Sequence, residues 1–469
     1  MAELSPMMQK YLETKAEYND CILFYRLGDF YEMFFEDAKI VSKELELTLT
    51  GKQCGLEERA PMCGVPYHAV EGFLNKLISK GYKVAICEQV EDPKLAKGLV
   101  KREVTRIVTP GTNLDMQALD DTKNNYLMCI AYIADRYGIS VCDVTTGQFN
   151  STEVDSVRKL LDEIYKYAPA EIICNDSFLV SGADVEEIKY RLSVSVYPLE
   201  AWYFDDELCV QKIKDHFKVD NLSCFGFPEG DSSVISSGAL LAYLYETQKN
   251  SLGQIRTIKS YDVSQYMILD SATRRNLELT ETMRDKQKKG SLLSVLDRTR
   301  TAMGGRALRG MLEQPLIIKD EINKRLDAVD DLLKNAITRE ELREYLNPVY
   351  DLERLMSRVI YKSANPRDLI ALSGSLKMLG PIKQQMGELN SALMKELYNE
   401  LDTLDDMYEL ISSAISEDAP MQIKEGGIIK EGYNETVDSL RCAKSEGKGW
   451  LARLEAKDRE RTGIKNLKV

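Results

Sequence analysis

The periodicity of the sequence changes near residue 260, and this change limits the folds open to the chain. Before it, short apolar or alternating runs typical of strands are interspersed with runs of helical spacing. After it, long helical patterns dominate, over residues 321–334, 337–345, 352–361 and 393–416. No fixed-period repeat is visible, which disfavours a solenoid. The sequence therefore predicts α/β modules followed by an all-α part, and 469 residues at about 150 per domain suggest about three domains.

Residues 1–115 predict a compact α/β module. Strand-like runs occupy residues 22–25, 83–89 and 103–109, and Gly28-Asp29 offers a bend after the first of them. Helical spacing occupies residues 36–47 and 69–80, and Gly81 supplies a stop for the second helix. The turn sequence at residues 109–112 marks a plausible domain boundary.

Residues 125–250 predict a second α/β module. Strand-like runs at 126–134 and 138–144 surround a turn, and a short buried strand is expected at 171–174. Helices are expected at 154–167 and 185–192. This order suggests a sheet with crossover helices.

The C-terminal stretch predicts one long helix over residues 432–462. A strand-like run, GIKNLKV, follows at 463–469 with nothing after it to pair with. We therefore expect the chain to be a fragment that stops within a larger architecture.

Composition points to an ordinary globular protein of the cytoplasm. Apolar residues make up 44% and charged residues 29% of the chain, and no run approaches the roughly 18 apolar residues of a membrane span. The first twenty residues are too polar for a signal peptide. The ten Cys are scattered with no C-x-x-C pair, as expected of structural thiols. With only two His, a His-built zinc site or a Ser-His-Asp triad is nearly excluded.

The net charge of −13 argues against non-specific nucleic-acid binding by the chain as a whole, yet basic residues are concentrated locally. Residues 284–309 carry eight basic and two acidic groups, and residues 441–468 carry nine against four. A third basic stretch, at 94–106, includes Lys101, Arg102 and Arg106. These stretches fit either phosphate contacts or, as is commoner, solvated faces.

The sequence contains no phosphate-binding loop of the form G-x-x-x-x-G-K-[ST]. Gly51-Lys52 has Glu46 and Gln53 at the flanking positions, and Gly447-Lys448 has Cys442 and Gly449. Without this Walker A loop, we expect no nucleotide hydrolysis and no enzyme activity from this chain.

The most informative stretch is FYRLGDFYEMF at residues 24–34. If residues 30–32 are extended, Phe30 and Glu32 point to the same face, because side chains alternate along a strand. On pattern alone, a core Phe beside a surface charge is the simpler interpretation. The functional alternative is a base probe, in which Phe30 wedges into a base step while Glu32 accepts a hydrogen bond from a base edge.

This stretch resembles the mismatch-binding domain of the MutS family of DNA mismatch repair proteins. The resemblance continues in family order through residues 60–70, 84–89, 104–112, 269–278, 290–299, 301–306, 314–316 and 365–369 (APMCGVPYHAV, VAICEQ, VTRIVTPGT, LDSATRRNLE, GSLLSVLDRT, TAMGGR, QPL and NPRDL). These motifs extend over nearly the whole chain and follow the order of the family.

The resemblance implies a multidomain protein, α/β followed by all-α. Its parts would be a small mixed α/β mismatch-binding domain at 1–115, an RNase H-like α/β connector at 116–250, a helical core and lever domain at 251–432, and a lever helix at 433–469 running to the start of a DNA clamp. Phe30 would then be the intercalating residue and Glu32 the residue that hydrogen-bonds the mispaired base. Arg106 is a weaker candidate for a contact near the mismatch, and Lys101 and Arg102 are candidates for phosphate contacts.

The resemblance also implies partners beyond this chain. They are mismatched duplex DNA, a second copy in a homodimer, a MutL-like downstream repair factor and the sliding clamp, in a cytoplasmic, nucleoid-associated setting. ATP and Mg²⁺ would belong to a C-terminal ATPase domain that this chain lacks, and no cofactor is expected in the chain itself.

Three other functions remain as alternatives. One is a helical protein-interaction scaffold that reads no bases, and another is a relative that handles branched DNA. The third is a metal-dependent nuclease built around Asp143, but no second and third carboxylate stand at convincing positions to hold the ions.

Overall fold

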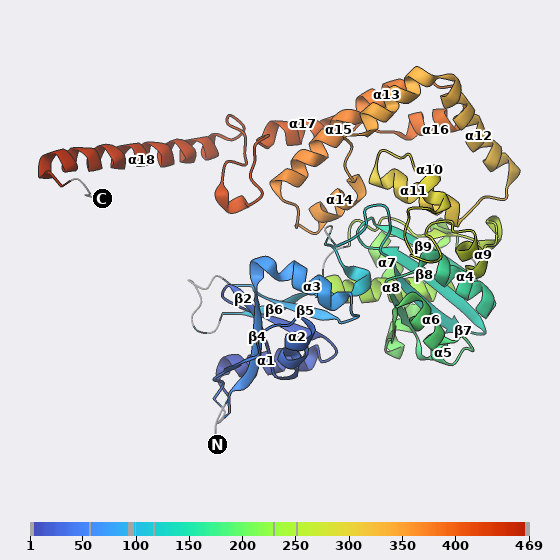
Figure 1. The fold of residues 1–469 in the computed structure, drawn as a ribbon, viewed down its shortest axis with the longest axis horizontal. Helices are drawn as coiled ribbons and strands as arrows, with labels where there is room; N and C mark the ends of the chain where they lie inside the picture. Colours follow the sequence, from blue (N-terminus) through green and yellow to red (C-terminus); the bar gives the residue numbers. More distant parts are fainter. Residues whose placement is uncertain are drawn as a thin grey trace. The chain divides into compact units, whose positions relative to one another are not determined.

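The computed structural model describes residues 4–55, 58–91, 98, 100–115, 118–227, 230–249 and 252–464. The chain divides into two compact units. Unit 1 contains residues 1–322 with 356–362, and unit 2 contains residues 323–355 with 363–469. Unit 1 holds both β-sheets, and unit 2 is helical (Figure 1).

The first sheet has six strands in the order β3-β4-β2-β1-β5-β6. These strands are β1 (Ile22–Leu27), β2 (Phe30–Phe34), β3 (Thr50–Lys52), β4 (Ala60–Pro66), β5 (Val84–Gln89) and β6 (Arg102–Val108). Strand β1 is antiparallel to β2 and parallel to β5. The three strands predicted in this module are confirmed, and the bend at Gly28-Asp29 is the turn of the β1–β2 hairpin.

Two apolar layers cover the first sheet, one on each face. On one face, Tyr31 and Met33 pack with side chains of α2 (Phe35–Glu44) and α3 (Val70–Ile78), the two helices predicted from the sequence. On the other face, Tyr25 and Phe34 pack with side chains of α1 (Pro6–Glu17). Below, these are the α2/α3 face and the α1 face.

The second sheet has the order β11-β10-β7-β8-β9-β12. Its strands are β7 (Leu127–Ile133), β8 (Arg136–Asp143), β9 (Gln148–Val154), β10 (Glu171–Cys174), β11 (Ser195–Pro198) and β12 (Lys259–Ser260). Strands β7, β8 and β9 run antiparallel, whereas β10 is parallel to β7 and β11 is parallel to β10.

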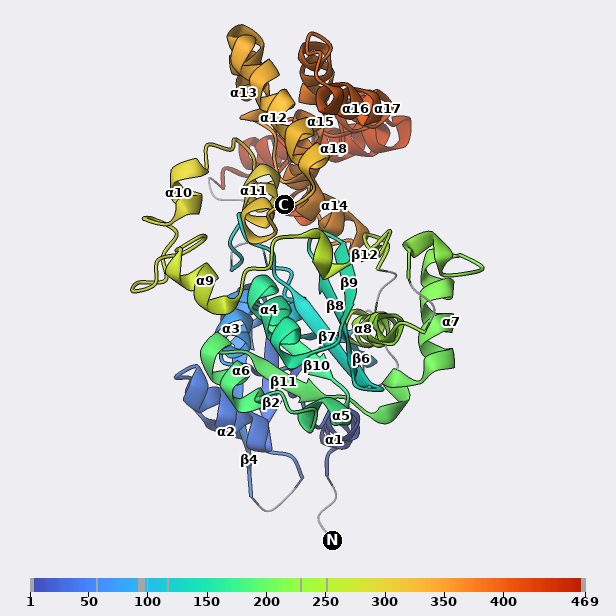
Figure 2. The ribbon, with the colours of Figure 1, turned by 90° about the vertical axis from the view of Figure 1, so that its right-hand side faces the viewer.

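Helices pack on both faces of the second sheet (Figure 2). On one side lie α7 (Asp206–Phe217) and α8 (Ser232–Gln248), and on the other lie α4 (Val157–Tyr167) and α6 (Val185–Leu192). A short helix, α5 (Asp176–Leu179), follows β10. The predicted strands at 126–134, 138–144 and 171–174 and the helix at 185–192 are confirmed.

Strand β9 corrects the expectation that a helix begins at Val154. The helix α4 begins at Val157, and residues 148–154 form a strand instead. Three of its buried side chains are polar (Asn150, Ser151 and Thr152), so the strand lacks an apolar signature. Ser151 is nonetheless satisfied, because its hydroxyl shares hydrogen bonds of 2.9 and 3.0 Å with Ser140 of β8 and Ser237 of α8.

A buried carboxylate joins the turn after the first sheet to the second sheet. Glu171 of β10 accepts hydrogen bonds from the Thr109 hydroxyl, from the Gly111 amide at 3.1 Å and from the Tyr243 hydroxyl at 2.8 Å. Nearby, the Tyr197 hydroxyl donates to the Gly81 carbonyl at 2.6 Å. These contacts fix the mutual orientation of the two sheets within unit 1.

The remaining helices of unit 1 are α9 (Ser271–Asn276), α10 (Leu292–Leu296) and α11 (Ala302–Glu313). The helices α12 (Lys319–Lys334) and α14 (Leu352–Ile360) each have residues in both units. Those of unit 2 are α13 (Ala336–Leu346), α15 (Pro366–Met386), α16 (Ala392–Glu400), α17 (Asp405–Ala414) and α18 (Glu435–Thr462). No helix in the described part of the chain is long and apolar enough to cross a membrane.

The helix predicted at 393–416 is wrong, because two helices, α16 and α17, occupy this stretch. Leu404, between them, has a left-handed backbone (φ 51°), and its amide donates to Asp402 at 3.0 Å. The Lys383 ammonium also binds the Leu401 carbonyl at 2.5 Å and so satisfies the end of α16. The predicted helices at 321–334, 337–345, 352–361 and 432–462 are confirmed with small shifts at their ends. The strand-like run at 463–469 lies outside the described residues from position 465 onward.

Replacing Glu171 with Ala should lower the free energy of unfolding by about 3 kcal/mol, because three buried donors lose their acceptor. Urea denaturation followed by circular dichroism measures this loss. As a control, Glu186→Ala on the surface of α6, where the side chain is 83% exposed, should change stability by less than about 0.5 kcal/mol. Equal loss in both variants would contradict the role given to Glu171.

His216 of α7 should make stability fall as the pH is lowered. Its Nε2 donates to the Ile255 carbonyl and its Nδ1 accepts from the Tyr245 hydroxyl, both at 2.8 Å. Burial lowers the pKa of His216 below its ordinary 6.5, so the unfolded chain takes up the proton first. The stabilising effect of neutral His216 is thus present above about pH 6.5 and is lost below it. His216→Gln should show a shallower loss of stability between about pH 7.5 and 5.5 in urea titrations, and identical slopes would refute this account.

Candidate nucleic-acid interface

The β1–β2 hairpin places Phe30 at its tip. Gly28 has a positive φ of 60° and Asp29 does not, the pattern of a two-residue type II′ turn, which needs Gly at its first central position. Tyr25 then pairs with Glu32, and Leu27 with Phe30. The register of the hairpin follows from this turn, and with it the face on which each side chain lies.

Alternation along β2 sends Phe30, Glu32 and Phe34 to the α1 face of the first sheet. Phe34 is buried there, with its ring in edge contact with Tyr11 of α1 at 4.9 Å between ring centres. Phe30 is 47% exposed. A large aromatic ring is therefore held in solvent by a strand whose next residue, Tyr31, lies in the core.

Glu32 lies beside Phe30 and is ion-paired across the sheet. The Lys52 ammonium of β3 lies 2.5 Å from Glu32 Oε2, and the two side chains are 31% and 18% exposed. On β4, the residue opposite Glu32 is Gly64, which has no side chain to cover it. The carboxylate is thus accessible, partly shielded and electrically balanced.

A second group of side chains steadies the hairpin tip from the α2/α3 face. The Arg26 guanidinium lies between two rings, 3.9 Å from the centre of Tyr67 and 5.4 Å from that of Tyr31. The Tyr31 hydroxyl donates to Glu88 of β5, and burial together with this carboxylate raises the pKa of Tyr31. The Tyr67 amide donates to the Asp29 carbonyl at 3.0 Å. Sequence reasoning missed Arg26, Tyr67 and Lys52 as supports, although all but Lys52 lie in the motifs that carry the family resemblance.

The three basic candidates of the 94–106 stretch differ in their surroundings. Lys101 is 68% exposed and ion-paired with Glu103 at 2.6 Å. The Arg102 guanidinium donates to the Arg26 carbonyl at 2.7 Å and to the Val100 carbonyl at 2.8 Å. Arg106 is paired with Glu71 of α3 at 2.8 Å, on the α2/α3 face. The structure therefore does not bring Arg106 to the face that carries Phe30 and Glu32.

Three family models match the chain in succession. They are described as MutS domain I over residues 5–117, MutS domain II over 125–256 and MutS domain III over 272–467. The chain belongs to the MutS family of DNA mismatch repair proteins.

Curated MutS proteins match the full extent of the chain. The DNA mismatch repair protein MutS of Lachnoclostridium phytofermentans is 62% identical over 469 residues, which are 100% of this chain and 50% of that protein. The MutS proteins of Acetivibrio thermocellus (100% of this chain, 54% of that protein) and Caldanaerobacter subterraneus subsp. tengcongensis (99% and 54%) are 56% and 52% identical. The chain thus spans about half the length of the curated relatives it matches.

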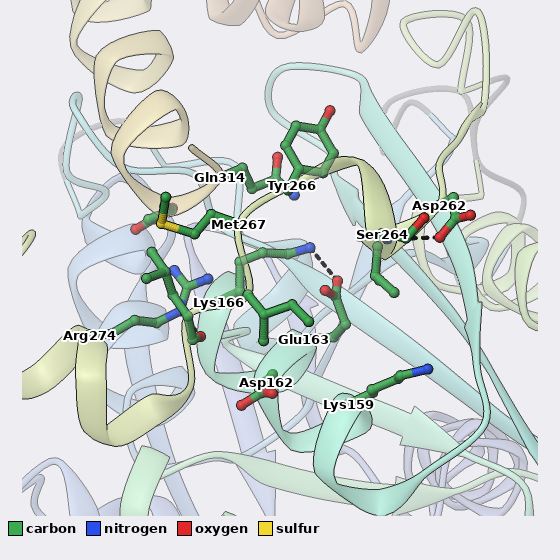
Figure 3. Close-up of a pocket in the computed structure, with 14 residues that line it drawn as sticks. Lys159, Asp162, Glu163, Lys166, Asp262, Ser264, Tyr266, Met267, Arg274 and Gln314 are labelled. Atoms are coloured by element: carbon green, nitrogen blue, oxygen red, sulfur yellow. Dashed lines mark hydrogen bonds and ion pairs between the residues drawn. The ribbon is translucent and has the colours of Figure 1, made fainter. Parts of the chain in front are cut away.

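Between the segments matched by the MutS domain II and domain III models lies a cavity of about 210 Å³ (Figure 3). Lys166 of α4 is ion-paired there with Glu163, and its ammonium also contacts the Tyr261 hydroxyl at 2.9 Å. Burial lowers the pKa of Lys166 to about 8, against the opposing effect of Glu163. Arg274 of α9 donates to the Leu269 carbonyl at 2.9 Å. Because Lys166 is held by Glu163 and Tyr261, and Arg274 by a backbone carbonyl, we interpret the cavity as part of the packing between the two segments.

Asp143 of β8, the residue considered for a metal-dependent nuclease, has a structural role. It is fully buried and accepts hydrogen bonds from the amide and hydroxyl of Thr145, at 2.9 and 2.7 Å, and from Asn124 at 2.8 Å. Among the described residues, no group of three His, Cys, Asp or Glu side chains is arranged to hold a metal ion. Asp143 thus orders the turn between β8 and β9.

Proposed function

We propose that this chain recognises mispaired or unpaired bases in duplex DNA, with Phe30 as the wedge and Glu32 as the hydrogen-bond acceptor. The observation that carries the proposal is the pairing of an exposed Phe ring with an accessible carboxylate on one face of a braced hairpin. Membership of the MutS family supports the same function.

Selectivity in this proposal comes mainly from the DNA. A mismatch weakens stacking, so bending and unstacking cost less there than in sound duplex. Phe30 enters from the minor groove and stabilises the kink by stacking on one mispaired base. Glu32 then fixes that base by accepting a hydrogen bond. Against fully paired bases its carboxylate would be desolvated without gaining a hydrogen bond, which disfavours ordinary duplex.

Of the basic candidates, we propose Lys101 as a phosphate contact. Its ammonium is exposed, and its ion pair with Glu103 is the kind of surface pair that costs little to exchange. Arg102 is engaged with backbone carbonyls and Arg106 with Glu71, so we propose that both act mainly by holding the domain together.

Further proposals concern the whole protein that such a chain would belong to. We infer a homodimer that works with a MutL-like factor and a sliding clamp, and an ATPase domain, with ATP and Mg²⁺, outside this chain. The domain boundaries at 115, 250 and 432 stay predictions. The strand order of the second sheet supports an RNase H-like connector.

Phe30→Ala should abolish most of the preference for mismatched DNA, by about ten-fold or more, because stacking on one base contributes about 1–3 kcal/mol. Fluorescence anisotropy at low salt would compare a duplex containing one G·T pair with its perfect match. Ile40→Ala, an exposed apolar residue of α2, is the matched control and should retain the preference. If Phe30→Ala discriminates like the parent chain, Phe30 is not the wedge.

Glu32→Ala should also lower the preference for mismatched DNA, but by strengthening binding to the perfect duplex. Binding to the perfect duplex should strengthen by a few-fold, because Lys52 loses its counter-charge and leaves a net positive charge near the phosphates. Competition titrations with matched duplex measure this change. Glu36→Ala on α2, which also removes an ion-paired carboxylate, should leave the ratio of the two affinities unchanged. Unaltered affinity for perfect duplex in Glu32→Ala would count against the role of Glu32.

A further inference from the structure

We propose that Lys52 is a specificity-determining positioning residue, which acts on mismatch recognition through Glu32 and not by binding phosphate. This inference rests on the base-contacting role proposed for Glu32. It adds to the recognition site a residue of β3, which lies twenty positions after Glu32 in the sequence.

The Lys52–Glu32 pair spans three strands of the first sheet. Lys52 pairs with Ala60 on β4, and Glu32 pairs with Gly64 further along the same strand. The Lys52 ammonium nevertheless lies 2.5 Å from Glu32 Oε2. The same ammonium is 5.5 Å from the centre of the Phe34 ring. The side chain therefore runs diagonally over the α1 face, along the ring that neighbours the site.

Gly64 keeps the region next to the carboxylate open. A Cβ atom at this position would lie 3.6 Å from Glu32 Cγ and 3.2 Å from the Tyr31 carbonyl oxygen, the second distance being tighter than ordinary contact. A side chain on β4 would thus crowd Glu32. Among the described residues, Lys52 is the one charged group that holds Glu32 in its orientation.

The pair leaves one oxygen of Glu32 available. Lys52 binds Oε2, and among the described residues no group hydrogen-bonds Oε1. A carboxylate can accept bonds on both oxygens at once. With Oε2 held, Oε1 is one fixed acceptor beside the exposed Phe30 ring, the arrangement needed to accept from a single N–H on a displaced base.

The pair also removes an electrostatic penalty. A lone carboxylate brought close to DNA is repelled by the phosphates, and this repulsion is strong in a partly desolvated interface. Lys52 balances that charge before DNA arrives. Without Lys52, Glu32 would be both repelled and free to change rotamer, so the hydrogen bond made at a mismatch would contribute less to binding.

The test is Lys52→Met, with anisotropy titrations of the G·T duplex and its perfect match. We expect the ratio of the two affinities to fall about two- to five-fold, the size typical of a partly exposed ion pair. Lys52→Arg, which keeps the charge, should restore most of the ratio. Lys39→Met is the matched control, because Lys39 is ion-paired with Glu36 on α2 and should leave the ratio unchanged. Circular dichroism confirms that each variant is folded.

A double-mutant cycle separates positioning from direct phosphate binding. If Lys52 acts through Glu32, Lys52→Met should not change the affinity ratio further when Glu32→Gln is already present. If Lys52 instead binds phosphate, Lys52→Met should weaken both duplexes alike, with or without Glu32, and should reduce the slope of log K against log salt by about one. The second pattern, or an unchanged ratio in Lys52→Met, overturns the proposal.

Failure of this inference can be distinguished from failure of the proposed function. If Phe30→Ala and Glu32→Ala lower the preference but Lys52→Met does not, only the role of Lys52 is refuted. If the parent chain shows no mismatch preference, or keeps it in both variants, the proposed function and this inference fall together.

Discussion

The pairing of β1 with β2 is the constraint on which the candidate interface depends. Strand β1 lies between β2 and β5, so it fixes both neighbours, and the type II′ turn at Gly28 and Asp29 sets the β1–β2 register. A slip of one residue would send Phe30 into the core and Tyr31 into solvent, because side chains alternate between faces. The buried Tyr31 and Met33 make such a slip costly, so the same side chains that stabilise the fold also hold Phe30 outward.

The shared face of Phe30 and Glu32 can be predicted from the sequence alone, because the prediction requires only that side chains alternate over three extended residues. Phe30 and Glu32 share a face wherever residues 30–32 are extended, whatever else the chain does. The role of Lys52 depends on a different kind of information. Its contact with Glu32 crosses β4, and neither residue's local sequence indicates a partner twenty positions away.

Two other differences from expectation have equally local causes. The register between β5 and β6 shifts at Ile86 and Cys87, where a bulge adds one residue to β6 and reverses the faces of those that follow. Arg106 is consequently directed to α3, although strict alternation from Arg102 would place both arginines on one face. Strand β9 was not predicted because three of its buried positions are polar. Serines of β8 and α8 satisfy Ser151 there, so the strand shows no hydrophobic periodicity in the sequence.

The charge of the chain is consistent with a site of this kind. A protein with net charge −13 gains little affinity for DNA from its overall field. At the hairpin the local charge is balanced, since Lys52 offsets Glu32 and Arg26 is enclosed by aromatic rings near Glu88. What the hairpin presents is therefore a ring and one acceptor oxygen on a rigid support. Such a surface offers little to an intact duplex, whose bases are stacked and paired, and more to a duplex in which one base can be displaced at low cost. In the proposed function, discrimination follows because the protein is rigid at the hairpin while the DNA at a mismatch is easily bent and unstacked.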